Sequence, residues 1–232
     1  MNKLISKRVM TLVTAVLLLT AAFTACTSSA KSKAVKGTPL VKDSAIVEGK
    51  LDNGMSYFVR SNKEPNNRIY LRLAVNTGSA NEDDDQKGIA HFIEHMCFNG
   101  TKHFEKGRLT NYFESIGMKF GPEVNAYTNM EETVYMLEIP ADNPEFLDNA
   151  LTILNDWACA VSFDHEEIDK ERGVVIEEIR MRKDQPWTKV YNTTNNAMYT
   201  SHPYKRDVIG TPEIISQVSQ ETIMNYYRTF YF

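Results

Sequence analysis

The 232-residue sequence has no run of basic residues, no internal repeat, no low-complexity tract and no glycine-rich phosphate loop. A net charge of -4 without a basic run argues against a nucleic-acid partner. The absence of a repeat excludes solenoids and propellers, and the absence of a glycine-rich loop excludes a P-loop nucleotide site. A hydrophobic content of 42% and a charged content of 24% are typical of a globular protein.

Cysteine is also scarce, with only three in the chain. Cys97 and Cys159 both lie in apolar segments that are expected to be helical. This context favours two buried, free thiols over a disulfide.

The first 25 residues predict a secretory signal peptide rather than part of the fold. Three basic residues precede the uncharged apolar run TLVTAVLLLTAAF. A transmembrane anchor is the alternative, but the run is short for a full span. The run leads into FTAC, which resembles a bacterial lipobox and predicts a lipid on Cys26, unless the cysteine is incidental in an ordinary signal peptide. Residues 26–45 would then form a polar tether between a membrane of the bacterial cell envelope and the globular part.

Residues 46–232 carry the patterns of paired strands followed by helices. Asn53-Gly54 between two extended runs predicts a β-hairpin, and alternating apolar residues over 68–79 predict a strand with one buried face. Residues 123–140 predict two strands around an Asn-Met-Glu-Glu turn. The segments expected to be mainly helical are 83–100, closed by Gly100, then 107–117, 143–160, 164–183, 186–200 and 211–232. This order favours an α+β fold, an antiparallel sheet packed with helices.

The segment GIAHFIEHMCFNGT (88–101) contains two of the five histidines of the chain, four residues apart. On a helix His91 and His95 project from one face and can bind the same metal ion, most readily zinc. Glu94 lies on the edge of that face, where it can deprotonate a metal-bound water. Cys97 points away from His95 and is disfavoured as a ligand, and His103 is expected at the surface.

A catalytic zinc takes three protein ligands and leaves one place for water, so a third ligand must come from another segment. The expected helix over 164–183 offers Glu171, Glu177 and Glu178. Glu171 and Glu178 are two turns apart and share a face, whereas Glu177 is rotated away. Acidic residues on helices are usually solvated, so this segment leaves the choice open.

Three segments in this order, 88–101, NAYTNMEETVY (125–135) and ERGVVIEEIRM (171–181), resemble the pitrilysin or M16 metallopeptidases. This family includes insulin-degrading enzyme and the mitochondrial processing peptidase. The resemblance extends from about residue 47 to the last residue and is closest to the long bacterial periplasmic zinc proteases. It implies a metallohydrolase domain of the LuxS/mitochondrial-processing-peptidase-like type over 46–232.

The resemblance also implies one zinc ion per catalytic domain, bound by His91 and His95, with Glu94 as the general base. The local pattern Glu-Arg-x-x-x-x-x-Glu places the third ligand at Glu178 and a supporting catalytic acid at Glu171. Counting from His95 by the family's usual interval would instead choose Glu171. We follow the local pattern, because an insertion can change a count but cannot move a residue to another helical face.

The resemblance further implies that an extended peptide adds to the edge of the sheet at Asn125 and Ala126. The expected activity is that of a zinc endopeptidase acting on peptides or small unfolded proteins in the periplasm or at the outer membrane. The alternative is a non-catalytic binding or assembly subunit, although such family members typically lose the metal motif. Family members enclose substrate between two halves, and the distant half, or a partner subunit, supplies an Arg/Tyr pair. The chain is therefore expected to be truncated at its C-terminal end and inactive alone.

Overall fold

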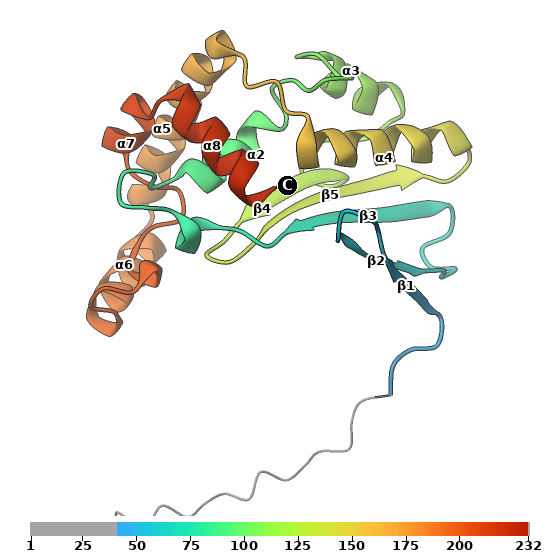
Figure 1. The fold of residues 1–232 in the computed structure, drawn as a ribbon, viewed down its shortest axis with the longest axis horizontal. Helices are drawn as coiled ribbons and strands as arrows, with labels where there is room; N and C mark the ends of the chain where they lie inside the picture. The colour runs from blue at the N-terminus through green and yellow to red at the C-terminus, as the bar shows by residue number, and fades with distance from the viewer. Residues whose placement is uncertain (1–40, 232) are drawn as a thin grey trace, which may run out of the picture. The chain divides into compact units, whose positions relative to one another are not determined.

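The structure is a computed structural model that describes residues 41–231 (Figure 1). The predictions for residues 1–25 and for Cys26 lie outside the described residues. The chain divides into two compact units, one ending at Ser61 and one beginning at Asn62.

The first unit contains the predicted β-hairpin. Strand β1 (Ile46–Lys50) pairs antiparallel with β2 (Ser56–Arg60), and Lys50 lies opposite Ser56. The connecting loop contains Gly54 at φ +94°, a left-handed conformation that glycine adopts without a steric penalty. The hairpin prediction is therefore confirmed.

The second unit is built on a three-stranded antiparallel sheet in the order β3-β5-β4. Its strands are β3 (Arg68–Val75), β4 (Val124–Thr128) and β5 (Thr133–Pro140). Burial alternates along β3 as predicted, and Leu71 and Leu73 lie opposite Leu137 and Tyr135 of β5 on the buried face. The α+β prediction with an antiparallel sheet is confirmed.

The helices cover the buried face of this sheet and continue beyond one end of it (Figure 1). Helix α4 lies along the sheet and contacts β3 and β5, while α2 contacts β4, α5 and α8. Every segment predicted to be helical contains helix, and the segment that begins at residue 211 contains two helices. The bounds are α2 Ile89–Met96, α3 Arg108–Ser115, α4 Pro144–Cys159, α5 His165–Lys183, α6 Pro186–Met198, α7 Pro212–Gln217 and α8 Gln220–Phe230, with short 3-10 turns η1 Ser79–Asn81 and η2 Pro203–Lys205.

The predicted segment 83–100 contains α2, and one detail of the prediction is wrong. Acidic residues precede the helix, as expected, since it begins at Ile89 after a turn that contains the three aspartates 83–85. It ends at Met96, and Gly100 (φ +126°) lies beyond a further turn rather than at the helix end. Hydrophobic periodicity located the helix, but glycine as a stop signal placed its end one turn too late.

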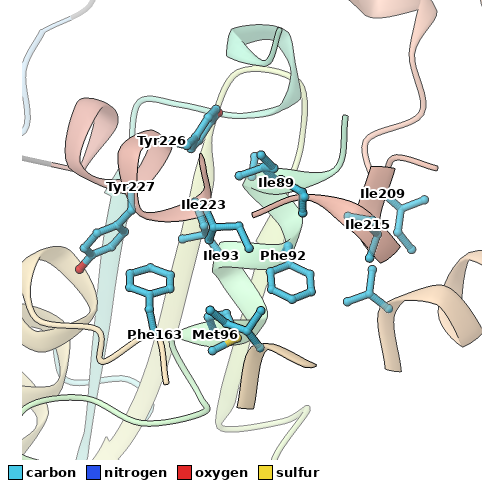
Figure 2. Packing of buried hydrophobic residues seen from close by; sticks show 14 residues of the cluster. Ile89, Phe92, Ile93, Met96, Phe163, Ile209, Ile215, Ile223, Tyr226 and Tyr227 are labelled. Carbon is cyan, nitrogen blue, oxygen red and sulfur yellow. The ribbon is translucent and has the colours of Figure 1, made fainter. Parts of the chain in front are cut away.

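Helix α2 is the centre of the larger apolar cluster. Ile89, Phe92, Ile93 and Met96 are buried and pack with residues of α5, α7 and α8, including Ile223 (Figure 2). Apolar contacts therefore surround the helix on several sides, so its polar side chains have few routes to solvent. No helix among residues 41–231 is both long enough and apolar enough to cross a membrane.

The two cysteines of the described part differ from each other. Cys97 is buried, as expected, and its thiol donates to the Tyr135 hydroxyl at 3.2 Å. Cys159 is exposed, which corrects the prediction that both are buried. Its helix α4 is amphipathic, and Cys159 lies on the side away from the core. Both are free, as predicted.

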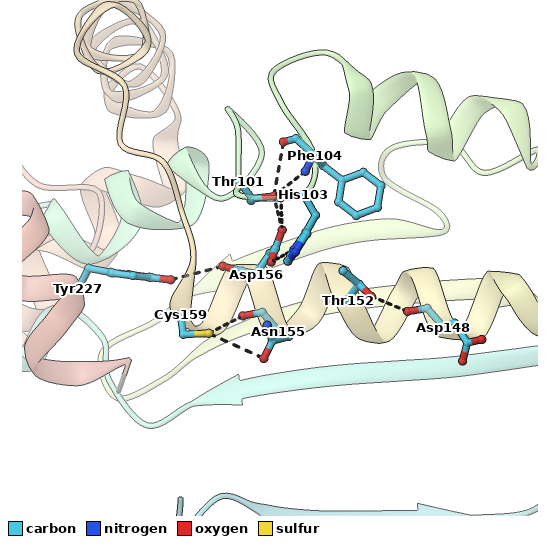
Figure 3. Close-up of polar contacts among 9 residues, drawn as sticks. All are labelled: Thr101, His103, Phe104, Asp148, Thr152, Asn155, Asp156, Cys159 and Tyr227. Atoms are coloured by element: carbon cyan, nitrogen blue, oxygen red, sulfur yellow. Dashed lines mark hydrogen bonds and ion pairs between the residues drawn. The ribbon is translucent and has the colours of Figure 1, made fainter.

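The buried carboxylate of Asp156 on α4 forms hydrogen bonds with the loop after α2. Asp156 accepts hydrogen bonds from the Thr101 hydroxyl at 2.7 Å and the His103 amide at 2.9 Å (Figure 3). Its other oxygen lies 2.8 Å from Nδ1 of His103, whose ring is half exposed. The surface position expected for His103 is correct, but its ring has a buried partner.

Replacing Asp156 by alanine is expected to lower the free energy of unfolding by about 2–4 kcal/mol, because it leaves a hydroxyl and an amide without their buried acceptor. His103→Ala should cost about 1 kcal/mol, since it removes one contact of a half-exposed ring. Urea unfolding of both variants measures the difference. Equal losses would mean that Asp156 acts only through His103.

Candidate metal centre

Three polar side chains project from the buried helix α2. His91 and Glu94 are buried, and His95 is the only residue of the helix that is not. The rings of His91 and His95 lie side by side, with centroids 4.6 Å apart. Burying imidazole and carboxylate groups is costly unless they have partners, so the partners of these three groups define the site.

The facing helix α5 brings a carboxylate to both imidazoles. Oε2 of Glu178 lies 3.5 Å from Nε2 of His95 and 3.8 Å from Nε2 of His91. One ligand atom from each of the three side chains falls within 4.8 Å of the others. Ligands of a tetrahedral zinc ion lie about 3.4 Å apart, so the three donors fit a shared ion after small adjustments.

The remaining nitrogen of His95 is held by the second acid of α5. Nδ1 of His95 lies 2.7 Å from Oε1 of Glu171, and the other oxygen of Glu171 accepts from the Asn99 side chain at 2.7 Å. A carboxylate in this position fixes the ring so that its other nitrogen can face a metal ion. Glu177, the third acid considered, is exposed and pairs with Arg180.

Two residues of this arrangement were not predicted from the sequence. Asn99 orients Glu171, and Arg182 contacts the second oxygen of Glu178 at 2.8 Å. Arg182 lies four residues after Glu178 on α5, so helical spacing could have indicated it. Asn99 lies in the turn beyond α2, where helical spacing gives no indication.

The two imidazoles differ in their affinity for protons. Burial, reinforced by the charge of neighbouring His95, lowers the pKa of His91 to about 3. Burial also opposes protonation of His95, but its contacts with Glu171 and Glu178 outweigh this effect and raise its pKa to about 9. The interaction with His95 lowers the pKa of Glu178. The metal-free site therefore holds a neutral His91 beside a protonated His95.

Glu94 lies in a cleft beside the histidines. A space of about 270 Å³ is lined by Glu94, His95, Phe98, Phe120, Ala126 and Glu171, among others. Oε2 of Glu94 accepts a hydrogen bond from the Thr128 hydroxyl at 2.6 Å. Burial raises the pKa of Glu94, and the Thr128 bond opposes the rise. No local pattern pointed to Thr128, because strand pairing brings it to the helix.

Strand β4 forms one edge of the three-stranded sheet and borders the same cleft. The backbone carbonyl of Glu123 accepts a hydrogen bond from the backbone N–H of Glu138 on the neighbouring strand. Backbone groups alternate in direction along a strand, so those of Asn125 face β5 and those of Ala126 face outward. The outward N–H of Ala126 donates to the Asn125 side-chain oxygen at 2.9 Å. The structure thus presents Ala126, rather than the Asn125 backbone, at the open edge.

Comparison with known proteins identifies relatives of this chain. The sequence profile described as Insulinase (Peptidase family M16) matches residues 57–212. The probable zinc protease PqqL of Haemophilus influenzae is 42% identical over 190 residues, covering 82% of this chain and 20% of that protein. The Escherichia coli protein of the same name is 34% identical over 192 residues, covering 83% and 21%.

Solved structures agree with the sequence comparison. The crystal structure of the first half of the periplasmic protease PqqL from Escherichia coli superposes with a TM-score of 0.78 at 33% identity. The match covers 83% of this chain and 41% of that one. The chain spans about one fifth of the length of the curated relatives named above.

Binding of Zn²⁺ by this site is expected to release one proton at neutral pH. His95 is protonated below a pKa of about 9 and must lose that proton to bind metal, whereas His91 is already neutral. Affinity should therefore rise about tenfold per pH unit, or about a hundredfold from about pH 6 to about pH 8. Competition with a chromophoric chelator measures this slope. A hundredfold rise per pH unit, which means two protons released, or no dependence on pH would contradict the assigned protonation states.

Proposed function

The chain belongs to the insulinase family of peptidases, M16, and on this premise we propose that it carries the metal centre of a zinc-dependent endopeptidase. The observation that carries the proposal is the convergence of His91, His95 and Glu178 from two helices on one point. We assign these three side chains as the zinc ligands. Bound there, zinc would polarise a peptide carbonyl and lower the pKa of a water molecule.

Glu94 is the general base of this proposal. It lines the same cleft as His95, and burial raises its pKa, which makes the carboxylate a stronger base. The carboxylate takes a proton from the attacking water and later gives it to the leaving amine nitrogen. The hydroxyl of Thr128 holds one oxygen of Glu94 at 2.6 Å and leaves the other for this exchange.

Glu171 orients His95 rather than touching the substrate. Its two oxygens are used by His95 and Asn99, which supports a role in fixing the imidazole and argues against a second base.

The substrate is a peptide in extended conformation that adds to the edge of β4. The outward N–H and C=O of Ala126 can pair with a peptide backbone beside Glu94, which is the usual form of β-augmentation. The Asn125 side chain occupies the Ala126 N–H and must rotate away when a peptide binds. Asn125 then becomes available to contact the substrate near the bond that is cut.

The relatives suggest where the activity belongs. The matched protease of Escherichia coli is described as periplasmic, and we propose a location in the cell envelope for this protein. Because this chain matches only about one fifth of the length of these relatives, we infer that peptide hydrolysis also requires a further half of the protein or a partner subunit. Lipidation of Cys26 remains a prediction.

Glu94→Gln is expected to abolish peptide hydrolysis without loss of zinc, because it removes the base and no ligand. Hydrolysis should be measured with the present chain joined to the remainder that the longer relatives carry, and zinc content by elemental analysis.

His91→Ala is the matched control and should lose both zinc and hydrolysis. Substantial hydrolysis by Glu94→Gln would exclude Glu94 as the base, while a zinc-free Glu94→Gln protein would reassign it as a ligand.

Glu178→Gln is expected to weaken zinc binding more than Glu171→Gln does. The first change removes a ligand, whereas loss of a residue that orients a ligand costs about 10–100-fold in affinity. Zinc titration of the two variants provides the comparison. The opposite order would favour Glu171 as the third ligand, as the residue count does.

A further inference from the structure

The N-terminus of α2 is not capped by its own first residue. Helices α4, α5 and α8 begin after Asn143, Asp164 and Ser219, whose side chains accept backbone N–H groups of the first turn. Helix α2 begins after Gly88, which has no side chain to do this. The first N–H groups of a helix must nevertheless find acceptors when they are buried.

A close approach of two backbone segments explains why glycine occupies this position. Gly88 has φ +96°, and a Cβ atom there would lie 2.6 Å from the carbonyl oxygen of Ile209. The backbone at Gly210 is equally close to Gly88, since a Cβ atom on Gly210 would lie 2.5 Å from Cα of Gly88. Any capping side chain at position 88 is therefore excluded, and the cap has to come from elsewhere.

Glu82 supplies that cap from six residues upstream. Its two carboxylate oxygens accept from the N–H of Gly88 at 3.0 Å and from the N–H of Ala90 at 2.9 Å. The residue is only 4% exposed. Arg206 donates to the backbone oxygen of Glu82 and not to its carboxylate, so the helix N–H groups are the contacts of the charged group.

We propose that Glu82 is a positioning residue for the metal centre, which holds the start of α2 so that His91 and His95 meet Glu178. A carboxylate at a helix N-terminus is favoured by the helix dipole and makes charge-assisted hydrogen bonds, which fix its position more firmly than neutral ones. The first histidine directly follows Ala90, one of the two residues that Glu82 holds. The inference rests on the proposed metal site.

The burial of Glu82 supports a specific role. Burial raises its pKa to about 7, although the N–H groups of Ala90 and Gly88 act against this rise. A neutral cap such as the asparagine of α4 would avoid the cost of burying a charge. What the carboxylate adds is a second acceptor oxygen, which spans two N–H groups of one turn.

The test measures Zn²⁺ affinity and backbone hydrogen exchange in Glu82→Ala and Glu82→Gln, using the full 232-residue chain. Glu82→Ala should bind Zn²⁺ about tenfold more weakly than the unmodified chain. Its metal-free form should exchange the amide protons of α2 faster. Glu82→Gln retains one acceptor oxygen, so its Zn²⁺ affinity and its amide exchange should lie between those of Glu82→Ala and of the unmodified chain. This variant keeps the test available if the alanine variant does not fold.

Asn143→Ala is the matched control. It removes the cap of α4, which carries no metal-site residue, so it should lower the melting temperature and leave Zn²⁺ affinity unchanged. Unchanged affinity in both Glu82 variants would overturn the proposal, as would an equal loss of affinity in Asn143→Ala. If the unmodified chain binds no Zn²⁺, the proposed function fails. Faster exchange confined to α2 would then still assign Glu82 to holding this helix, and unchanged exchange would reject it.

Discussion

The proposed metal centre depends on the burial of helix α2. Apolar side chains on several sides of this helix pack against α5, α7 and α8, and this packing leaves His91, Glu94 and His95 with little solvent. Polar groups in such surroundings must find partners inside the protein. Here the partners of His95 are Glu171 and Glu178 of α5. The partner of Glu94 is Thr128 of β4. The same apolar packing that stabilises the fold therefore sets the distances within the site.

Burial also makes two neighbouring imidazoles chemically different. Among residues 41–231, no carboxylate lies within hydrogen-bonding distance of His91, and burial holds its ring neutral, whereas Nδ1 of His95 lies 2.7 Å from Glu171 and His95 holds a proton. In the metal-free protein that proton reduces the repulsion between Glu171 and Glu178. A divalent cation can replace it, so the metal-free arrangement is already close to one that accepts a metal ion.

Sequence patterns predicted most of the elements, because periodicity indicates which residues are buried and turn residues indicate where strands end. The alternation along β3 is an example of the first, and the turn between β4 and β5 is an example of the second. The end of α2 was misplaced, because Gly100 is a typical stop signal but the helix already ends at Met96. The sequence did not indicate that Glu82 caps the start of the helix, because Glu82 lies six residues before Gly88. The exposure of Cys159 depended on which side of α4 meets the sheet, and composition alone could not indicate it. For the site, helical spacing grouped His91 with His95 and Glu171 with Glu178. It could not indicate Thr128, whose place depends on strand register and on packing between distant segments.

The central claim is that one metal ion binds between α2 and α5. Anomalous diffraction at the zinc absorption edge, from crystals of the zinc-loaded chain, tests it most directly. The account predicts a single peak within about 2.0–2.2 Å of Nε2 of His91, Nε2 of His95 and a carboxylate oxygen of Glu178. A peak at another group, such as the exposed thiol of Cys159, with none between the two helices, would contradict it.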